Sequence, residues 1–253
     1  MTAILGRRRA APPPADPDAP EAAQPLMTHL LELRDRLVRA SLGVLITTML
    51  AFFFSQKLMD LFLAIKPQNL DVQIQVIDVT EKFVTYFKVS LTAGLVLSMP
   101  IIIYELLRFL APGLRRNEQR MVLLGLPFVI LFFAAGVSFA YLVLLPNALS
   151  FLLGFGSPDI KSNILLSKYI GFVTNFMLAV GVVFEMPPVM FMLAKLGIVS
   201  AQRMSGFRRY AIVLIVVIAA IITPTPDPFN QMAVAVPMYL LYELGILLAR
   251  FAR

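Results

Sequence analysis

Six apolar runs follow one another between residues 40 and 249, and most charged residues fall between these runs. A helix needs about 20 mostly apolar residues to cross the roughly 30 Å hydrocarbon core of a bilayer. The pattern therefore predicts an all-α fold, a polytopic membrane protein with six transmembrane helices. The predicted spans are about 40–56, 89–107, 121–145, 169–194, 210–222 and 232–249.

The last two spans are predicted to be short helices. Residues 210–222 would cover only about 20 Å at the rise of an α-helix, and a bilayer accommodates such a helix by thinning locally. The next segment, 223–227, has the sequence TPTPD and cannot prolong the helix, because prolines lack a backbone donor. We therefore expect a short fifth helix folded back on a short sixth helix.

The basic residues are distributed unevenly between the two sides that these spans define. Sixteen of the 22 Lys and Arg residues, every arginine among them, fall on the side that holds both termini and the 108–120 and 195–209 segments. The remaining six, all lysines, fall on the other side. The positive-inside rule assigns the arginine-rich side to the cytoplasm. We therefore expect both termini in the cytoplasm, and the net charge of +7 indicates topology rather than nucleic-acid binding.

The composition agrees with residence in a membrane and excludes several kinds of chemistry. The chain is 59% hydrophobic and only 15% charged, whereas about a quarter of the residues in a soluble domain are charged. Cysteine is absent and His29 is the only histidine, which argues against disulfides, metal sites and Ser-His hydrolysis. No phosphate-binding loop or intramembrane-protease motif occurs. We expect no enzyme, no cofactor and no metal.

Residues 1–25 differ from the rest of the chain. Three consecutive arginines are followed by an Ala/Pro-rich stretch without the apolar core of a secretory signal. We expect a disordered cytoplasmic tail there, or an arginine-rich adaptor site. The six-helix membrane domain would then occupy 26–253.

Two acidic residues, Glu32 and Glu118, lie on the predicted cytoplasmic face. Segment 26–39 places leucines on one helical stripe and charges on the other, which predicts an amphipathic helix lying on the membrane before the first span. Glu118 lies in the loop after the second span. If the two acids approach each other, they form an acidic spot suited to a guanidinium group. Alternatively, each acid pairs internally, Glu32 with Arg36 and Glu118 with a neighbouring arginine.

Three further acids lie within or at the ends of the predicted spans. Glu185 is deep in the fourth span, where a charge costs several kcal/mol unless it is neutralised, paired or hydrated. Two interpretations remain: a protonated acid bonded to a neighbouring helix, or a polar pocket facing a partner helix or a wet cavity. Glu105 and Glu243 lie near cytoplasmic ends, and we expect them to pair with interface arginines such as Arg108 and Arg250.

Five motifs, occurring in one order, together resemble the TatC family, the multi-spanning receptor subunit of the twin-arginine protein translocase of the bacterial cytoplasmic (inner) membrane. They are HLLELRDRL at 29–37, FLAPGLRRNE at 109–118, FEMP at 184–187, TPTPD at 223–227 and VPMYLLYELG at 236–245. The resemblance covers about residues 26–251. Two departures stand out: Glu105 occupies a position where glutamine is common, and Leu63 and Ala64 replace an expected Pro-Leu pair.

The resemblance implies a function and a set of partners. Family members bind paired-arginine signal peptides of folded cargo proteins at the cytoplasmic face. They then recruit single-span partner subunits of the TatA and TatB type, which assemble by using the proton-motive force. Such receptors work within the membrane lipid as homo-oligomeric complexes, and no nucleotide is hydrolysed.

The same resemblance implies roles for individual residues. Glu32 and Glu118 would contact the two cargo arginines, and the fifth and sixth helices would dock the span of a partner. The residues expected to shape the signal-peptide site around the two acids are Arg34, Phe109, Pro112 and Leu114. The expected intramembrane polar or partner-binding residues are Glu185, Asp227, which would belong to an outer cap, and Glu243.

A proton-coupled small-molecule transporter, with Glu185 as its proton site, is the competing interpretation. The two functions differ in what deletion of the gene would abolish. Loss of folded twin-arginine cargo export would support the receptor, and loss of a metabolite flux with intact export would support the transporter.

Overall fold

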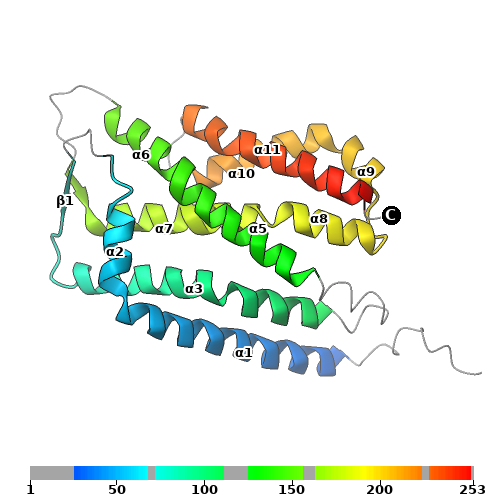
Figure 1. Ribbon diagram of the computed structural model, residues 1–253, viewed down its shortest axis with the longest axis horizontal. Helices are drawn as coiled ribbons and strands as arrows, with labels where there is room; N and C mark the ends of the chain where they lie inside the picture. Colours follow the sequence, from blue (N-terminus) through cyan, green and yellow to red (C-terminus); the bar gives the residue numbers. More distant parts are fainter. Residues whose placement is uncertain (1–25, 68–71, 111–124, 156–162, 224–227, 252–253) are drawn as a thin grey trace, which may run out of the picture.

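Helices make up nearly all of the chain that the computed structural model describes, which comprises residues 26–67, 72–110, 125–155, 163–223 and 228–251 (Figure 1). Residues 1–25, where the tail was predicted, lie outside these ranges. The helices are α1 Leu26–Phe53, α2 Ser55–Leu63, α3 Glu81–Leu110, α5 Leu126–Phe139, α6 Leu145–Gly154, α7 Leu166–Val183, α8 Met186–Lys195, α9 Ala201–Gly206, α10 Arg208–Ile222 and α11 Pro228–Phe251. A π-helical turn, Ala140–Leu144, joins α5 to α6. Two strands, β1 Gln73–Gln75 and β2 Asn163–Leu165, complete the described elements.

Five helical stretches are long and apolar enough to cross a bilayer. They overlap the first four predicted spans and the last one, and they comprise Leu30–Phe53, Glu81–Phe109, Leu126–Gly154, Leu166–Lys195 and Asn230–Phe251. Helix α10 has 15 residues, as expected of a short fifth helix. The prediction of a short sixth helix is wrong, because α11 has 24 residues. Its first residue is Pro228, and proline is favoured at the first helical position, where no backbone donor is needed.

Two predicted helix boundaries are also wrong. Residues 26–39 form no separate surface helix, because α1 continues unbroken to Phe53 as one rod (Figure 1). Pro146 does not end the third span, since the chain passes through the π-helical turn and continues as α6. The wider turn accommodates the proline ring. The side-chain amide of Asn147 donates to the carbonyl of Val143 over 2.7 Å and so supplies a local donor.

The core is built around α7, which packs against α3 and α5. Small residues bring α5 and α7 close together. A Cβ atom on Gly136 would lie 2.6 Å from Cβ of Phe184, and one on Gly181 would lie 2.8 Å from the Phe133 ring. Helices in a bilayer gain stability from such close backbone approach, because lipid provides no hydrophobic force between them.

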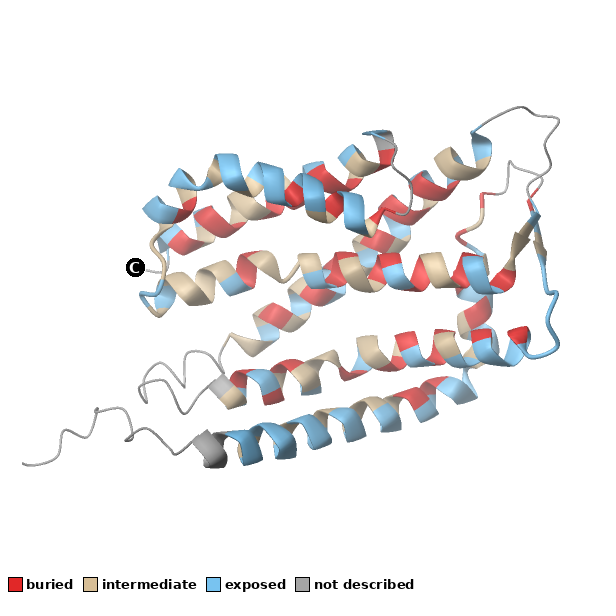
Figure 2. Cartoon of the chain, turned by 180° about the vertical axis from the view of Figure 1, so that it is seen from behind, coloured by how far each residue is buried: buried red, intermediate tan, exposed pale blue. Residues whose placement is uncertain are grey.

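Helix α1 is peripheral and is held mainly by α3. Only 11% of its span is buried, against 33–39% for the other four spans, and most of its surface is exposed (Figure 2). The two helices meet closely at Gly94, where a Cβ atom would lie 2.7 Å from Cα of Thr48. The hydroxyl of Thr47 donates to the Gly94 carbonyl over 2.9 Å.

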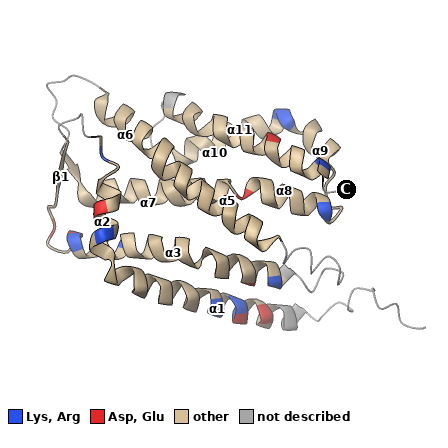
Figure 3. Cartoon of the chain, viewed as in Figure 1, with Lys and Arg blue, Asp and Glu red and all other residues tan. Residues whose placement is uncertain are grey.

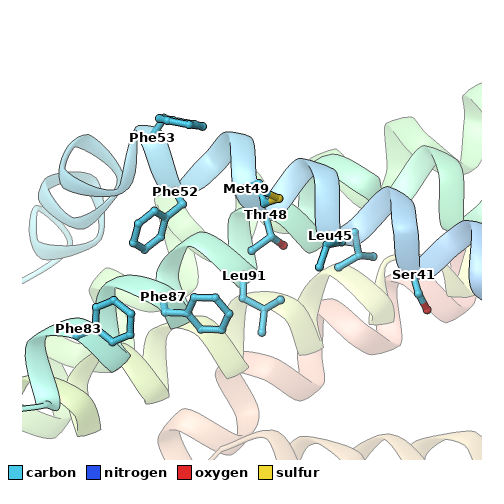
Figure 4. Close-up of a pocket in the computed structure, with 10 residues that line it drawn as sticks. Ser41, Leu45, Thr48, Met49, Phe52, Phe53, Phe83, Phe87 and Leu91 are labelled. Atoms are coloured by element: carbon cyan, nitrogen blue, oxygen red, sulfur yellow. The ribbon is translucent and has the colours of Figure 1, made fainter.

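An apolar groove of about 490 Å³ runs along the same two helices. Phe52 and Phe53 of α1 lie across it from Phe83 and Phe87 of α3 (Figure 4). Its lining is almost wholly hydrocarbon, which suits contact with lipid chains.

A short parallel sheet closes one end of the bundle, hereafter the sheet end. Strands β1 and β2 pair with Ile74 opposite Ile164, an element that the hydrophobic pattern did not predict. Beside the sheet, the buried carboxylate of Glu81 accepts hydrogen bonds from the backbone N–H of Ile77 at 3.0 Å and of Ser167 at 2.9 Å. Glu81 therefore ties the first turn of α3 to the first turn of α7.

We predict that Glu81→Ala lowers the stability of the folded protein. The change removes the acceptor of two backbone donors, and a hydrogen bond to a charged group contributes about 1.5–3 kcal/mol. Thermal unfolding of the purified protein in detergent measures the effect as a lower melting temperature. Asp60→Ala, at an exposed position on α2 near the same end, is the matched control. Equal melting temperatures for the two variants would contradict a tethering role for Glu81.

Candidate functional site

A network of four charged side chains, hereafter the Arg36 network, joins α1 to α3 at the end of the bundle opposite the sheet. Glu32 and Arg36 are one helical turn apart on α1, and Arg36 Nε donates to Glu32 Oε1 over 3.0 Å. A second guanidinium nitrogen of Arg36 also bonds Glu32. Arg36 Nη1 lies 3.4 Å from Glu105 Oε2, and Arg39 Nη1 lies 3.5 Å from Glu105 Oε1. One guanidinium group is therefore shared between acids on two helices.

The Arg36 network is partly removed from solvent. The side chain of Arg36 is only 12% exposed and that of Glu105 is 10% exposed, whereas that of Arg39 is 53% exposed. Removing one partner from such a pair leaves a poorly solvated charge, which is strongly destabilising. The carboxylates at this position therefore require a guanidinium or an equivalent cation.

The sequence predicted the contact between Glu32 and Arg36 but not the contacts of Arg36 and Arg39 with Glu105. The internal pairing of Glu32 with Arg36, one of the two open interpretations, is present. The expectation that Glu105 pairs with interface arginines is confirmed, but these are Arg36 and Arg39. Arg108, the example expected, donates to the hydroxyl of Tyr104 over 3.1 Å instead. Packing of α1 against α3 brings Arg36 and Arg39 to Glu105, and this contact between helices leaves no local sequence pattern.

The other residues predicted for the signal-peptide site lie outside the Arg36 network or outside the described residues. Arg34 lies outside the Arg36 network and donates to its neighbour Asp35 over 2.8 Å, with its own side chain 68% exposed. Phe109 is half-buried one turn beyond Glu105 on α3. Glu118, Pro112 and Leu114 lie outside the described residues.

Glu243 belongs to a second cluster, which joins α10 to α11. Arg208, the first residue of α10, donates to both Glu243 oxygens over 2.6 and 2.9 Å, and the Tyr239 hydroxyl donates over 2.9 Å. The expectation that Glu243 pairs with an interface arginine is confirmed, but the arginine is Arg208 rather than Arg250. The turn after α9 places Arg208 directly beside α11, and a bidentate guanidinium–carboxylate pair is both strong and geometrically specific.

Glu185 occupies the break between α7 and α8. It directly precedes α8, whose first turn carries the buried Pro187 and Pro188. Figure 3 shows an acidic position (red) at this break between α7 and α8. Both carboxyl oxygens are buried, and neither has a hydrogen-bond partner among the described residues. A polar group buried without a partner costs several kcal/mol. The described helices thus do not supply the hydrogen bond that the first interpretation of Glu185 required.

No metal site is present in the ranges that the structure describes, since no three acidic or histidine side chains gather there. Asp227, the expected outer-cap residue, lies outside those ranges.

One part of the site was missed from sequence altogether, namely the bridge from Arg36 to Glu105. Its only sequence signal was the glutamate at a position where the family commonly has glutamine.

Comparison with known proteins identifies the family. The family model described as Sec-independent protein translocase protein (TatC) matches residues 28–237. A relative of that name from Desulforapulum autotrophicum is 39% identical over 232 residues, which cover 91% of this chain and 86% of the relative. The relative from Deinococcus radiodurans is 38% identical over 255 residues and covers 96% of this chain and 93% of its own.

Solved structures agree in fold as well as in sequence. A crystal structure of the twin-arginine translocase receptor TatC superimposes with a TM-score of 0.77 at 36% identity, over 88% of this chain and 99% of that one. A second crystal structure of the receptor, in the detergent DDM, gives a TM-score of 0.78 at the same identity. The chain therefore belongs to the TatC family of Sec-independent protein translocase proteins.

Proposed function

We propose that this protein is the receptor subunit of a twin-arginine translocase in a bacterial inner membrane, and that it binds paired-arginine signal peptides of folded cargo at the Arg36 network. The observation that carries the proposal is the sharing of the Arg36 guanidinium between Glu32 and Glu105. A cargo arginine presents the same chemical group as the one already bound there. Arginine is preferred over lysine at such a site, because its planar fork bonds carboxylates in a bidentate manner.

The topology that fits this proposal has six spans and both termini in the cytoplasm. Helix α10 would be the sixth membrane-crossing element, at about 22 Å for its 15 residues. The unequal distribution of arginines assigns the end with the Arg36 network to the cytoplasm and the sheet end to the outside. Signal peptides would then meet the network from the side on which cargo folds.

Arg36 would act as an internal placeholder in the empty receptor. An incoming arginine bonds Glu32 while Arg36 withdraws, so no carboxylate is left uncompensated during the exchange. Glu118 would supply the acid for the second cargo arginine. The remaining residues proposed to shape this site are Arg34, Phe109, Pro112 and Leu114.

Single-span partner subunits of the TatA and TatB type would dock on α10 and α11. Leu214, Val217 and Ile221 form an exposed stripe at helical spacing on α10, where the described part of the chain covers them with no other helix. The Arg208–Glu243 pair lies at the cytoplasmic end of the same two helices. The unsatisfied carboxyl of Glu185 would meet a polar group of the arriving span, and Asp227 would belong to the outer cap.

We predict that Glu32→Gln and Glu118→Gln each weaken binding of a twin-arginine signal peptide about tenfold or more. A hydrogen bond to a charged group contributes about 1.5–3 kcal/mol, and 1.4 kcal/mol corresponds to a factor of ten. Site-specific crosslinking of the peptide to membranes containing each variant measures the loss. Asp60→Asn, at an exposed acid on α2 far from the Arg36 network, is the control. Undiminished crosslinking in both variants at normal protein levels would sink this assignment.

A second prediction concerns the placeholder. Arg36→Gln should raise the affinity for the twin-arginine peptide severalfold, because the competing internal guanidinium is gone. Fluorescence titration of a labelled peptide against the purified protein measures the change, and thermal unfolding reports the cost of leaving two acids unpaired. Arg39→Gln is the control, since Arg39 is half-exposed and bonds Glu105 and the backbone carbonyl of Asp35 rather than Glu32. Weaker peptide binding by Arg36→Gln at an unchanged melting temperature would mean that Arg36 positions the acids rather than occupying their site.

A further inference from the structure

A cavity of about 630 Å³ lies at the sheet end among α3, α6, α7 and α10, away from both charged clusters described above. Its lining divides into two chemical halves. Lys88, Lys168, Ser167 and Asn175 provide polar groups, and aromatic and branched aliphatic side chains such as Phe172 and Ile222 provide the rest. We call it the Lys88 cavity.

The spacing of residues along α7 builds one wall of the Lys88 cavity. Ser167, Gly171 and Asn175 follow one another at intervals of four and therefore share one face of the helix. Gly171 makes room for the amine of Lys88, because a Cβ atom at this position would lie only 3.2 Å from Nζ of Lys88. Helix α10 is short and ends at Ile222, on the rim of the cavity. It therefore does not cover the first turns of α7.

Two lysines and no acidic side chain line the Lys88 cavity among the residues that the structure describes. Neither the Lys88 nor the Lys168 ammonium group has a hydrogen bond or ion pair to any described residue. The carboxylate of Glu81 is close in sequence to Lys88, but it is bonded to backbone donors of Ile77 and Ser167. Lys88 is seven residues into a helix of membrane-crossing length, about 10 Å along its axis. Lys88 directly precedes the predicted second span, 89–107, so its amine lies at the outer membrane interface, where lipid headgroups carry their phosphates.

We propose that the Lys88 cavity binds an anionic phospholipid, with the phosphate between Lys88 and Lys168 and an acyl chain along the apolar half. Phosphate oxygens accept hydrogen bonds from ammonium, hydroxyl and amide groups, and all three kinds line the polar half. The apolar half distinguishes an amphiphile from free phosphate, because a small hydrated anion gains nothing from aromatic and aliphatic walls. The volume lies within the range of small-molecule sites.

Lipid binding to the purified full-length chain tests the proposal. Native mass spectrometry of the detergent-solubilised protein is titrated with phosphatidylglycerol, with zwitterionic phosphatidylcholine of the same acyl chains, and with phosphatidylglycerol in the presence of inorganic phosphate. We expect phosphatidylglycerol to bind at least tenfold more tightly than phosphatidylcholine and to resist millimolar phosphate. Equal binding of the two lipids, or displacement by inorganic phosphate at millimolar concentration, would overturn the proposal without any variant.

Two variants then place the bound lipid in the Lys88 cavity. The double change Lys88→Gln, Lys168→Gln removes the charges, and Gly171→Leu keeps the charges but fills the space under the Lys88 amine. Both should weaken phosphatidylglycerol binding at least tenfold. Lys57→Gln, an exposed lysine on α2 that lies outside the cavity, should leave it unchanged. Wild-type affinity in the double variant, or an equal loss in Lys57→Gln, would show that the lipid binds elsewhere.

Discussion

In hydrocarbon a polar group has no water to bond, so it needs a partner within the protein. This constraint governs most of the structure. Hydroxyl side chains within the spans bond carbonyls one turn back, as Thr85 does with Glu81 and Thr174 with Ile170. Several prolines occur at the starts of α5, α8 and α11 or follow the π-helical turn, where the missing donor is tolerated, whereas Pro100 and Pro237 lie inside α3 and α11. The carboxyl of Glu185 is an exception, since neither of its oxygens has a partner among the described residues, and for it we infer a partner from outside the chain.

The guanidinium groups of Arg208 and Arg36 bind their carboxylates with different geometries, and the geometries suit different roles. Arg208 is fixed by two short bonds to one carboxylate, which Tyr239 also bonds, so that pair fastens α10 to α11. Arg36 divides its donors between two acids on different helices, and its contact with Glu105 is long at 3.4 Å. A guanidinium that is shared between two carboxylates can leave them one after the other as a ligand takes its place. In a bidentate pair, both hydrogen bonds to the one carboxylate must break together. The first arrangement therefore suits exchange with a ligand and the second suits permanent assembly.

Much of the fold can be predicted from sequence, because the thickness of the bilayer sets the length of each apolar run. Hydropathy alone therefore locates the spans. Five spans and the shortness of α10 were predicted in this way. The errors arise where a local sequence rule ignores the residues that pack around the position in the folded protein. Pro146 was taken as a helix end because the π-helical turn before it carries no sequence signature. The charged partners of Glu105 and Glu243 were sought along their own helices, whereas both partners come from adjacent ones. The roles of Glu118, Pro112, Leu114 and Asp227 rest on motif position.

The attachment of α1 almost solely to α3 also bears on biogenesis. Both halves of the Arg36 network, and the close contact at Gly94, are complete once residue 110 has been made. At about 5–20 residues per second, the ribosome needs on the order of 10 s more to reach the end of α11. The first two spans can therefore insert and pair as an independent hairpin, which buries its charges while the rest of the chain is still unmade. Glu81, by contrast, waits for α7 to provide Ser167, so the two ends of this hairpin mature at different times.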